Sequence, residues 1–324
     1  MRSIVFTKGR PFVATIIILM LLAFSTVLIS ASSESPTGQQ SPLWSKPLPS
    51  SICPWSASDT DCHHSSPVVA DLTGDGKLEI IVATNSGHVL AYKHDGTELW
   101  DIDVSKAFGM ADNKQRIASS PAVADIDGDG RMEVVVGAGT IYGSICTQGG
   151  VIVLEDSGTI KNGWPFLTQD EYISPSGCRD SVRSTPALGD LDRDGDLEVV
   201  FASFDKRIYA VHHDGNIVPG FSPASYLYER FGWANLRDRL ADTIWSSPSL
   251  ADLDGDGYLD IVIGTDEGNF DNTYEPALGD WNCPYSTPTN GYCGGSIYAV
   301  DRFGKLLQVF RGMNLKPYNL HLLL

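Results

Sequence analysis

Apolar residues along this chain occur in short runs that are separated by turn residues. The first series of runs covers residues 65–71, 79–84, 87–93 and 97–102. Runs of this length, rich in β-branched and aromatic residues and bounded by Gly, Asp and Asn, indicate strands. Asp95-Gly96 lies between the third and fourth runs, and Asp-Gly is a hairpin signal because both residues tolerate positive φ. The series therefore predicts four antiparallel strands.

The same series of four runs recurs three more times along the chain. The repeats cover 119–125, 133–137, 150–154 and 163–166; then 184–190, 198–202, 207–211 and 217–221; then 246–252, 260–264, 295–300 and 305–310. Repeated four-stranded antiparallel units of roughly 60 residues are typical of β-propeller blades. We therefore expect an all-β fold, a β-propeller with blades at about 65–104, 119–166, 184–221 and 246–310.

Three insertions and one possible closing strand complete this plan. The insertions are 138–149, 222–245 and 265–294. Residues 42–48 resemble the fourth-strand sequence 98–104 and could complete a last blade. The fourth repeat already has its own fourth run, however, and no further loop follows it, so we expect a partial propeller with later blades absent.

An acidic loop of nine residues joins the first two runs of every repeat. Oxygen-bearing side chains stand at positions 1, 3, 5 and 9, and carboxylates at such close range repel one another. A hard cation with oxygen ligands relieves this repulsion, which favours calcium. The expected side-chain ligands are Asp71, Thr73, Asp75 and Glu79; Asp125, Asp127, Asp129 and Glu133; Asp190, Asp192, Asp194 and Glu198; and Asp252, Asp254, Asp256 and Asp260.

The repeated pattern Ser-[Ser/Thr]-Pro-x-x-[Ala/Gly]-Asp-x-[Asp/Thr]-x-Asp-Gly-x-x-[Glu/Asp] resembles FG-GAP/VCBS repeats, as in integrin α-chain propellers, over about residues 65–310. The resemblance implies up to four bound Ca²⁺ ions. It also implies a backbone-carbonyl ligand at position 7, which is Lys77, Arg131, Asp196 or Tyr258. Thr73 replaces a carboxylate in the first loop, so that site should be the weakest.

An EF-hand is the nearest competing interpretation of these loops. It requires a bidentate Glu at position 12 and flanking helices. Position 12 is apolar in all four loops and the flanking runs are strands, which excludes an EF-hand.

The N-terminus carries an export signal. Arg2, Lys8 and Arg10 precede an apolar run at 12–29, and no basic residue follows until Lys46. This asymmetry sends the rest of the chain across a membrane. Residues 1–31 form either a cleaved signal peptide or a signal-anchor helix, and the length rules leave both open. We expect a linker at 32–64 and a secreted or membrane-anchored propeller at 65–324, outside the cytoplasm.

Charge and cysteine content limit the partners and the compartment. The formal net charge is −17, and without a basic stripe this excludes nucleic acid and anionic membrane surfaces as partners. Membrane contact is expected only through an uncleaved N-terminal helix. The six cysteines indicate disulfides in an exported chain. We expect the pairs 53–62, 146–178 and 283–293, because each pair brackets one irregular segment.

Candidate chemistry outside the loops is sparse. The motifs H-E-x-x-H, G-x-S-x-G and G-x-G-x-x-G are absent from the sequence, so no catalytic residue is identified. Trp100, Trp164 and Trp245 are expected to pack between repeats. The pairs at 63–64 and 212–213 are adjacent histidines, which point to opposite faces of a strand and chelate poorly. We interpret them as surface or turn residues.

Two functions remain open at this point. The first is a non-enzymatic recognition or adhesion module with structural calcium, whose extracellular protein or glycan partner docks on the face that carries the insertions. The second is a secreted carbohydrate-active enzyme of the polysaccharide-lyase kind, or a quinoprotein-like propeller fragment. The last option rests on a resemblance of residues 87–100 to the strand-turn-strand segments of quinoprotein dehydrogenases, and fold analogy supplies no catalytic set.

Overall fold

The structure, a computed structural model, describes residues 43–48, 65–139, 147–170, 178–205, 207–221, 245–264, 297–305 and 307. The expected N-terminal helix and most of the linker and of the insertions lie outside these residues. Within the described part no helix is long and apolar enough to span a membrane. The chain divides into the units Met1–Ser45 and Lys46–Leu324, and every strand belongs to the second unit.

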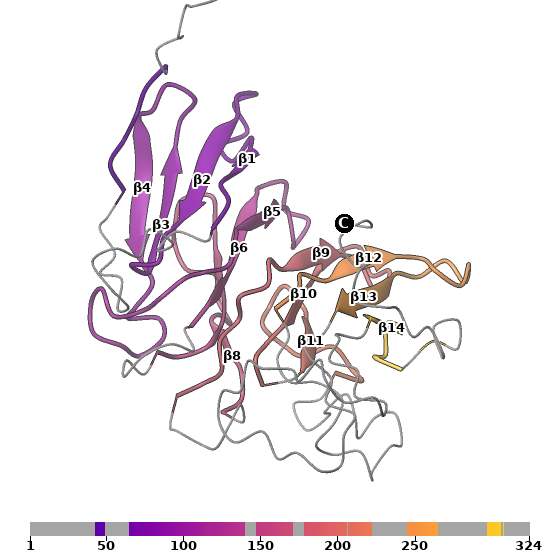
Figure 1. The fold of residues 1–324 in the computed structure, drawn as a ribbon. Coiled ribbons are helices and arrows are strands. Elements are labelled where there is room, and N and C mark those ends of the chain that lie inside the picture. The colour runs from indigo at the N-terminus through magenta and orange to yellow at the C-terminus, as the bar shows by residue number, and fades with distance from the viewer. Residues whose placement is uncertain are drawn as a thin grey trace, which may run out of the picture. The chain divides into compact units, whose positions relative to one another are not determined.

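Four separate antiparallel sheets make up the described part of the second unit (Figure 1), which confirms the all-β prediction. The strands of the first two sheets are β1 (Val68–Ala70), β2 (Glu79–Ala83), β3 (His88–Tyr92), β4 (Glu98–Asp103), β5 (Ala122–Ala124), β6 (Glu133–Ala138), β7 (Gly150–Leu154) and β8 (Phe166–Leu167). Those of the last two are β9 (Ala187–Gly189), β10 (Glu198–Ala202), β11 (Ile208–Val211), β12 (Ser249–Ala251), β13 (Asp260–Gly264) and β14 (Ile297–Val300). Neighbours in each sheet follow one another along the chain.

The fourth strands of the second and third sheets are shorter than the sequence predicts, whereas β4 of the first sheet has the expected length. In the third sheet the run at 217–221 makes one isolated bridge, Val211 to Ile217, and Val218 N–H donates to Ala210 O at 2.9 Å. Pro219 then lacks an N–H and Gly220 has φ +102°, so pairing stops. In the fourth sheet, Leu307 N–H donates to Ala299 O at 3.0 Å, and most of that run lies outside the described residues. The possible closing strand is not seen at 43–48.

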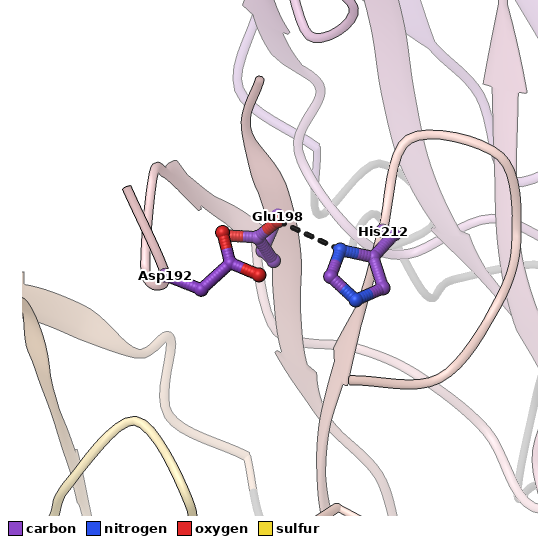
Figure 2. Close-up of side chains that lie close together, drawn as sticks. All are labelled: Asp192, Glu198 and His212. Atoms are coloured by element: carbon purple, nitrogen blue, oxygen red, sulfur yellow. Dashed lines mark hydrogen bonds and ion pairs between the residues drawn. The ribbon is translucent and has the colours of Figure 1, made fainter. Parts of the chain in front are cut away.

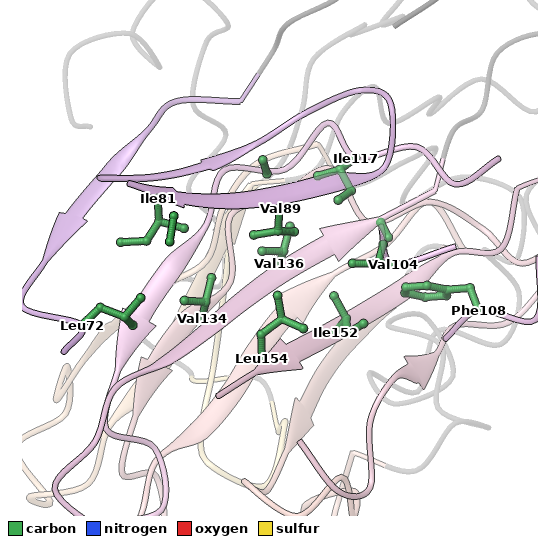
Figure 3. Close-up of a cluster of buried hydrophobic side chains, with 13 residues drawn as sticks. Leu72, Ile81, Val89, Val104, Phe108, Ile117, Val134, Val136, Ile152 and Leu154 are labelled. Carbon is green, nitrogen blue, oxygen red and sulfur yellow. The ribbon is translucent and has the colours of Figure 1, made fainter. Parts of the chain in front are cut away.

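Apolar side chains fill the spaces between successive sheets. From β6, Val134 and Val136 join a cluster shared with the first sheet (Figure 3). Val135 joins a cluster shared with the third sheet. Successive residues of a strand point to opposite faces, so a strand covered on both faces is apolar at every position. This explains why β6, β7, β10 and β11 are buried throughout, whereas burial alternates along β2.

The Ser-[Ser/Thr]-Pro segment of each repeat joins one sheet to the next. Ser66 N–H donates to Ser120 Oγ at 2.8 Å, and Thr185 N–H donates to Ser247 Oγ at 2.9 Å. The first strands are neighbours in the same order, since β1 contacts β5, β5 contacts β9, and β9 contacts β12. The motif therefore connects successive sheets at their first strands.

Two tryptophans also connect successive sheets. Trp100 Nε1 donates to Asp156 O and Trp164 Nε1 donates to His213 O, both at 2.9 Å. Each carbonyl belongs to a turn of the next sheet. The prediction of packing between repeats is confirmed for both residues. The prediction that Trp164 lies in a strand is wrong, because Gly163 with φ +91° and Pro165, which has no N–H, prevent pairing before Phe166.

The substitution Gly163→Ala tests how closely the second and third sheets approach each other. A Cβ at this position would lie 2.0 Å from Asp214 O, whereas at Gly109, with φ +70°, a Cβ meets nothing within 4 Å. Both positive φ values strain an alanine by about 1–2 kcal/mol. We expect Gly163→Ala to lower the free energy of unfolding by at least about 2 kcal/mol more than Gly109→Ala, because only the first moves backbone. Urea unfolding measures the difference. Equal losses would contradict the close approach.

Candidate metal centres

Each acidic loop is the connection of a β-hairpin, and strand pairing positions its last residue. The residue before the loop pairs with position 9 in all four sheets: Ala70 with Glu79, Ala124 with Glu133, Gly189 with Glu198, and Ala251 with Asp260. Position 9 is thus the first residue of the second strand. All four of these carboxylate side chains are buried.

The position-9 carboxylate closes the loop onto its own backbone. One of its oxygens accepts a hydrogen bond from the N–H of position 2 in every loop. The distances are 3.0 Å for Leu72 to Glu79, 2.8 Å for Ile126 to Glu133, 2.6 Å for Leu191 to Glu198, and 2.8 Å for Leu253 to Asp260. Charge-assisted bonds of this kind are stronger than neutral ones, so the loop holds a fixed shape.

The remaining carboxylates also accept backbone N–H groups. The position-6 glycine donates to position 1 in three loops: Gly76 to Asp71 at 2.9 Å, Gly130 to Asp125 at 2.9 Å, and Gly257 to Asp252 at 3.0 Å. Position 7 donates to position 5 in all four: Lys77 to Asp75 at 2.9 Å, Arg131 to Asp129 at 2.8 Å, Asp196 to Asp194 at 3.2 Å, and Tyr258 to Asp256 at 2.9 Å. The carboxylates are therefore turned inward over the loop.

The third loop departs from the others at position 4. Arg193 has φ 65° where the other loops have glycine, and its N–H donates to Asp190 at 2.6 Å. Its guanidinium lies 4.6 Å from the ring centroid of Tyr258 in the fourth loop. A cation–π contact of about 0.5–1 kcal/mol offsets part of the backbone strain, and it links two neighbouring loops.

Three loops bring carboxylates close enough together to hold a metal ion. In each group the ligand atoms all lie within 4.8 Å of one another: Asp125, Asp127 and Glu133 in the second loop, Asp190, Asp192 and Asp194 in the third, and Asp252, Asp254 and Asp260 in the fourth. The first loop forms no such group among the described residues. Asp129 and Asp256 also stand outside the groups. The prediction that the first site is the weakest stays a prediction.

Several of these carboxylates have buried oxygens that no hydrogen-bond donor reaches. They are Asp71 Oδ1, Asp125 Oδ1, Glu133 Oε1 and Asp196 Oδ1. A buried polar atom without a partner costs about 1–3 kcal/mol, and more for a charged group. A divalent cation would satisfy such oxygens, and an all-oxygen donor set suits a hard ion. The residues present therefore fit a metal ion.

Burial also changes the ionisation of three position-9 residues, since it raises the pKa of Asp260 as well as those of Glu133 and Glu198. It raises the pKa of Glu133 and the pKa of Glu198 to about 7. A cation at either loop would favour the ionised carboxylate and lower its pKa again. Cation binding at the loops of Glu133 and Glu198 would consequently be coupled to proton release near neutral pH.

Lys161 supplies a positive charge to the second loop from within the protein. Its Nζ lies 2.6 Å from Asp127 Oδ2, 3.2 Å from Glu155 Oε1 and 3.9 Å from Glu133 Oε1. The side chain is only 9% exposed. The sequence analysis missed this lysine. Its ammonium engages Asp127, one of the expected cation ligands, so it competes with a metal ion there.

The histidine pair at 212–213 contacts the third loop. His212 Nδ1 lies 3.0 Å from Glu198 Oε1 (Figure 2). His213 Nε2 lies 3.0 Å from Asp196 Oδ2. Calling them surface or turn residues was therefore incomplete. Val199 pairs with Val211. Because the two strands are antiparallel, Glu198, the residue before Val199, lies opposite His212, the residue after Val211. That rule could have found His212.

Of the six cysteines, only Cys178 lies in the described part of the chain. It is disulfide-bonded, and its partner lies outside the described residues. The predicted pairs 53–62, 146–178 and 283–293 therefore stay predictions, as do the position-7 carbonyl ligands.

Comparisons with known proteins agree with the repeat pattern. The FG-GAP-like repeat matches residues 60–136 and 190–263, so the chain contains FG-GAP-like repeats. It is 25% identical over 284 residues to the rhamnogalacturonan endolyase YesW of Bacillus subtilis (strain 168), which covers 72% of this chain and 44% of the relative. The chain thus spans less than half the length of this curated relative.

Two solved structures are similar to this chain at low identity. The C-terminal domain of Pseudomonas aeruginosa PilY1 has a TM-score of 0.46 and 17% identity, covering 74% of this chain and 51% of that one. BamB from Moraxella catarrhalis has a TM-score of 0.37 and 14% identity, covering 75% and 49%.

Lys161→Met tests the internal counter-charge of the second loop. Removing the buried ammonium leaves Asp127 and Glu133 facing each other without it, so a metal ion gains their full attraction. We expect one Ca²⁺ site to bind on the order of tenfold more tightly by calorimetry. Lys77→Met is the matched control, because Lys77 is 59% exposed and 3.9 Å from Asp75, where solvent screens its charge. Identical affinities in the two variants would contradict the assignment.

Proposed function

We propose that the chain is a calcium-stabilised β-propeller that works outside the cytoplasm as a recognition module. The observation that carries the proposal is the set of buried carboxylate oxygens without donors in the first hairpins of the first three sheets. Such atoms need a cation. In this proposal calcium is structural: it neutralises the hairpin and holds the first two strands of each sheet together.

Calcium is favoured over other ions for the second and fourth loops. Their candidate groups are all carboxylate, and calcium accepts six to eight oxygen ligands with flexible geometry. Magnesium demands a near-ideal octahedron and keeps several waters, which suits a dense carboxylate loop less well. Extracellular calcium sites are weak but stay loaded because the ion is plentiful there.

The propeller arrangement is supported by the repeated contacts between sheets. Four sheets of one design are joined in chain order through their first strands and through shared apolar clusters. This is the packing of propeller blades, in which each sheet covers the face of the next. The basic and apolar N-terminal sequence supports a secreted or membrane-anchored location.

The partner in this proposal is an extracellular protein or a glycan. It docks on the face that carries the insertions 138–149, 222–245 and 265–294, because loops on a rigid scaffold are the usual carriers of recognition. Most of these residues lie outside the described part of the chain.

A second candidate function is action on an acidic polysaccharide. The similarity to a rhamnogalacturonan endolyase over 72% of this chain favours it over the quinoprotein-like alternative, which rests on strand-turn-strand segments alone. In this case the propeller holds a catalytic set that the sequence motifs do not identify, and the bound cation also neutralises substrate carboxylates.

One experiment separates the two candidates. The purified chain is tested against immobilised glycans, including rhamnogalacturonan, and against extracellular proteins, with calcium and with a chelator. We expect binding in calcium, loss of binding in chelator because the hairpins open, and no unsaturated sugar product by ultraviolet absorbance. Accumulation of that product would reject the recognition module and support the lyase. Binding that is indifferent to the chelator would contradict the role given to calcium.

A further inference from the structure

We propose that the third loop, together with His212, forms a mixed nitrogen–oxygen site for a divalent transition-metal ion of the zinc class. The inference rests on the proposed function only in that the loops bind cations. It differs from the proposed function because it assigns a zinc-class ion to the third loop, whereas the all-carboxylate loops are expected to bind calcium.

Two sets of ligand atoms meet at His212. One contains Asp192, Glu198 and His212, and the other contains Asp194, Asp196 and His212; within each set all ligand atoms lie within 4.8 Å of one another. Figure 2 shows the Asp192 carboxylate and the His212 ring on either side of Glu198. Ligands about 2.0–2.1 Å from a tetrahedral zinc ion are separated by roughly 3.3 Å. The 3.0 Å between His212 Nδ1 and Glu198 Oε1 needs little change to reach that value.

A buried atom without a donor points to a ligand at the same place. Asp196 Oδ1 is buried and has no hydrogen-bond partner, although the other oxygen of that carboxylate lies 3.0 Å from His213 Nε2. His213 thus orients Asp196 in the way that a hydrogen-bonded neighbour orients a metal ligand. Asp196 and His212 belong to the same set of ligand atoms, so a single ion could contact both.

The other sheets have no imidazole at the position of His212. That position is the residue after the third strand, opposite position 9 of the loop, and it is Lys93, Glu155 or Asp301 elsewhere. Lysine repels a cation, and carboxylates add oxygen ligands that suit calcium. Neutral imidazole suits zinc, copper, iron and nickel. The difference in donor type therefore separates the third loop from the rest.

Carboxylate-only binding by the third loop is the main competing arrangement. Asp190, Asp192 and Asp194 form an all-oxygen group of their own, and a calcium ion there would leave His212 hydrogen-bonded to Glu198. The two arrangements share Asp192 and Asp194, so one loop does not hold both ions at full ligation. The test must therefore be done with calcium in excess.

The experiment uses the full chain, stripped with a chelator and then saturated with calcium. Cobalt(II) is titrated in, and its visible absorption reports nitrogen–oxygen coordination. We expect one cobalt ion per chain, displaced by zinc and not by excess calcium. His212→Asn should weaken cobalt binding at least tenfold, whereas His94→Asn, in the corresponding turn of the first sheet, should leave it unchanged. Calcium should raise the melting temperature of both variants as in the parent chain.

Three outcomes would overturn the proposal. The first is that the parent chain has no cobalt site, the second is that calcium displaces cobalt, and the third is that the parent chain and His212→Asn bind cobalt equally well. Each outcome would mean that His212 only hydrogen-bonds to Glu198 and binds no metal ion. If His212→Asn does not fold, the imidazole ¹⁵N shift of His212 on zinc addition decides in the parent chain, and no shift rejects the site. A calcium effect on melting without a cobalt site rejects this inference alone, whereas no calcium effect rejects the proposed function.

Discussion

Repulsion between carboxylates that are bent into one hairpin is the constraint on which this structure depends. Backbone N–H groups turn the acidic side chains of each loop inward. The buried carboxylate at position 9, the first residue of the second strand, accepts the N–H of position 2 in every loop. Hydrogen bonds from N–H groups relieve only part of the charge, because several buried oxygens remain without donors. We propose that a cation from solution neutralises the remaining charge; in the second loop Lys161 already supplies part of the positive charge.

The consequences reach beyond the loops because position 9 begins the second strand of each sheet. Those strands carry the apolar side chains that fill the spaces between sheets. Neighbouring loops are also joined directly, since Leu197 N–H in the third loop donates to Ile126 O in the second at 2.8 Å. A change of charge in one hairpin is thus transmitted to strand pairing, to the core and to the next hairpin.

Much of this arrangement could be predicted from the sequence because it is local and repeated. Strand runs, hairpin loops and the Ser-[Ser/Thr]-Pro segments recur at fixed offsets, so each of the four repeats supports the same assignment of strands and loop. The contact of His212 was missed because it depends on which residues lie opposite one another across a hairpin. The contact of Lys161 was missed because this residue reaches the second loop from 34 positions away in the sequence. The prediction of a fourth strand in the third sheet was wrong for a local reason, because Pro219 and Gly220 end its pairing. The insertions carry no repeat, and the sequence alone gives them no structure.

The most direct test of the central claim is thermal unfolding of the chelator-treated chain as calcium is added back, with elemental analysis of the untreated protein. If the carboxylate hairpins require a divalent cation, the melting temperature rises with calcium concentration as the ion binds the folded state, and the untreated protein contains calcium. A melting temperature that does not change with calcium, together with no bound metal, would contradict the account.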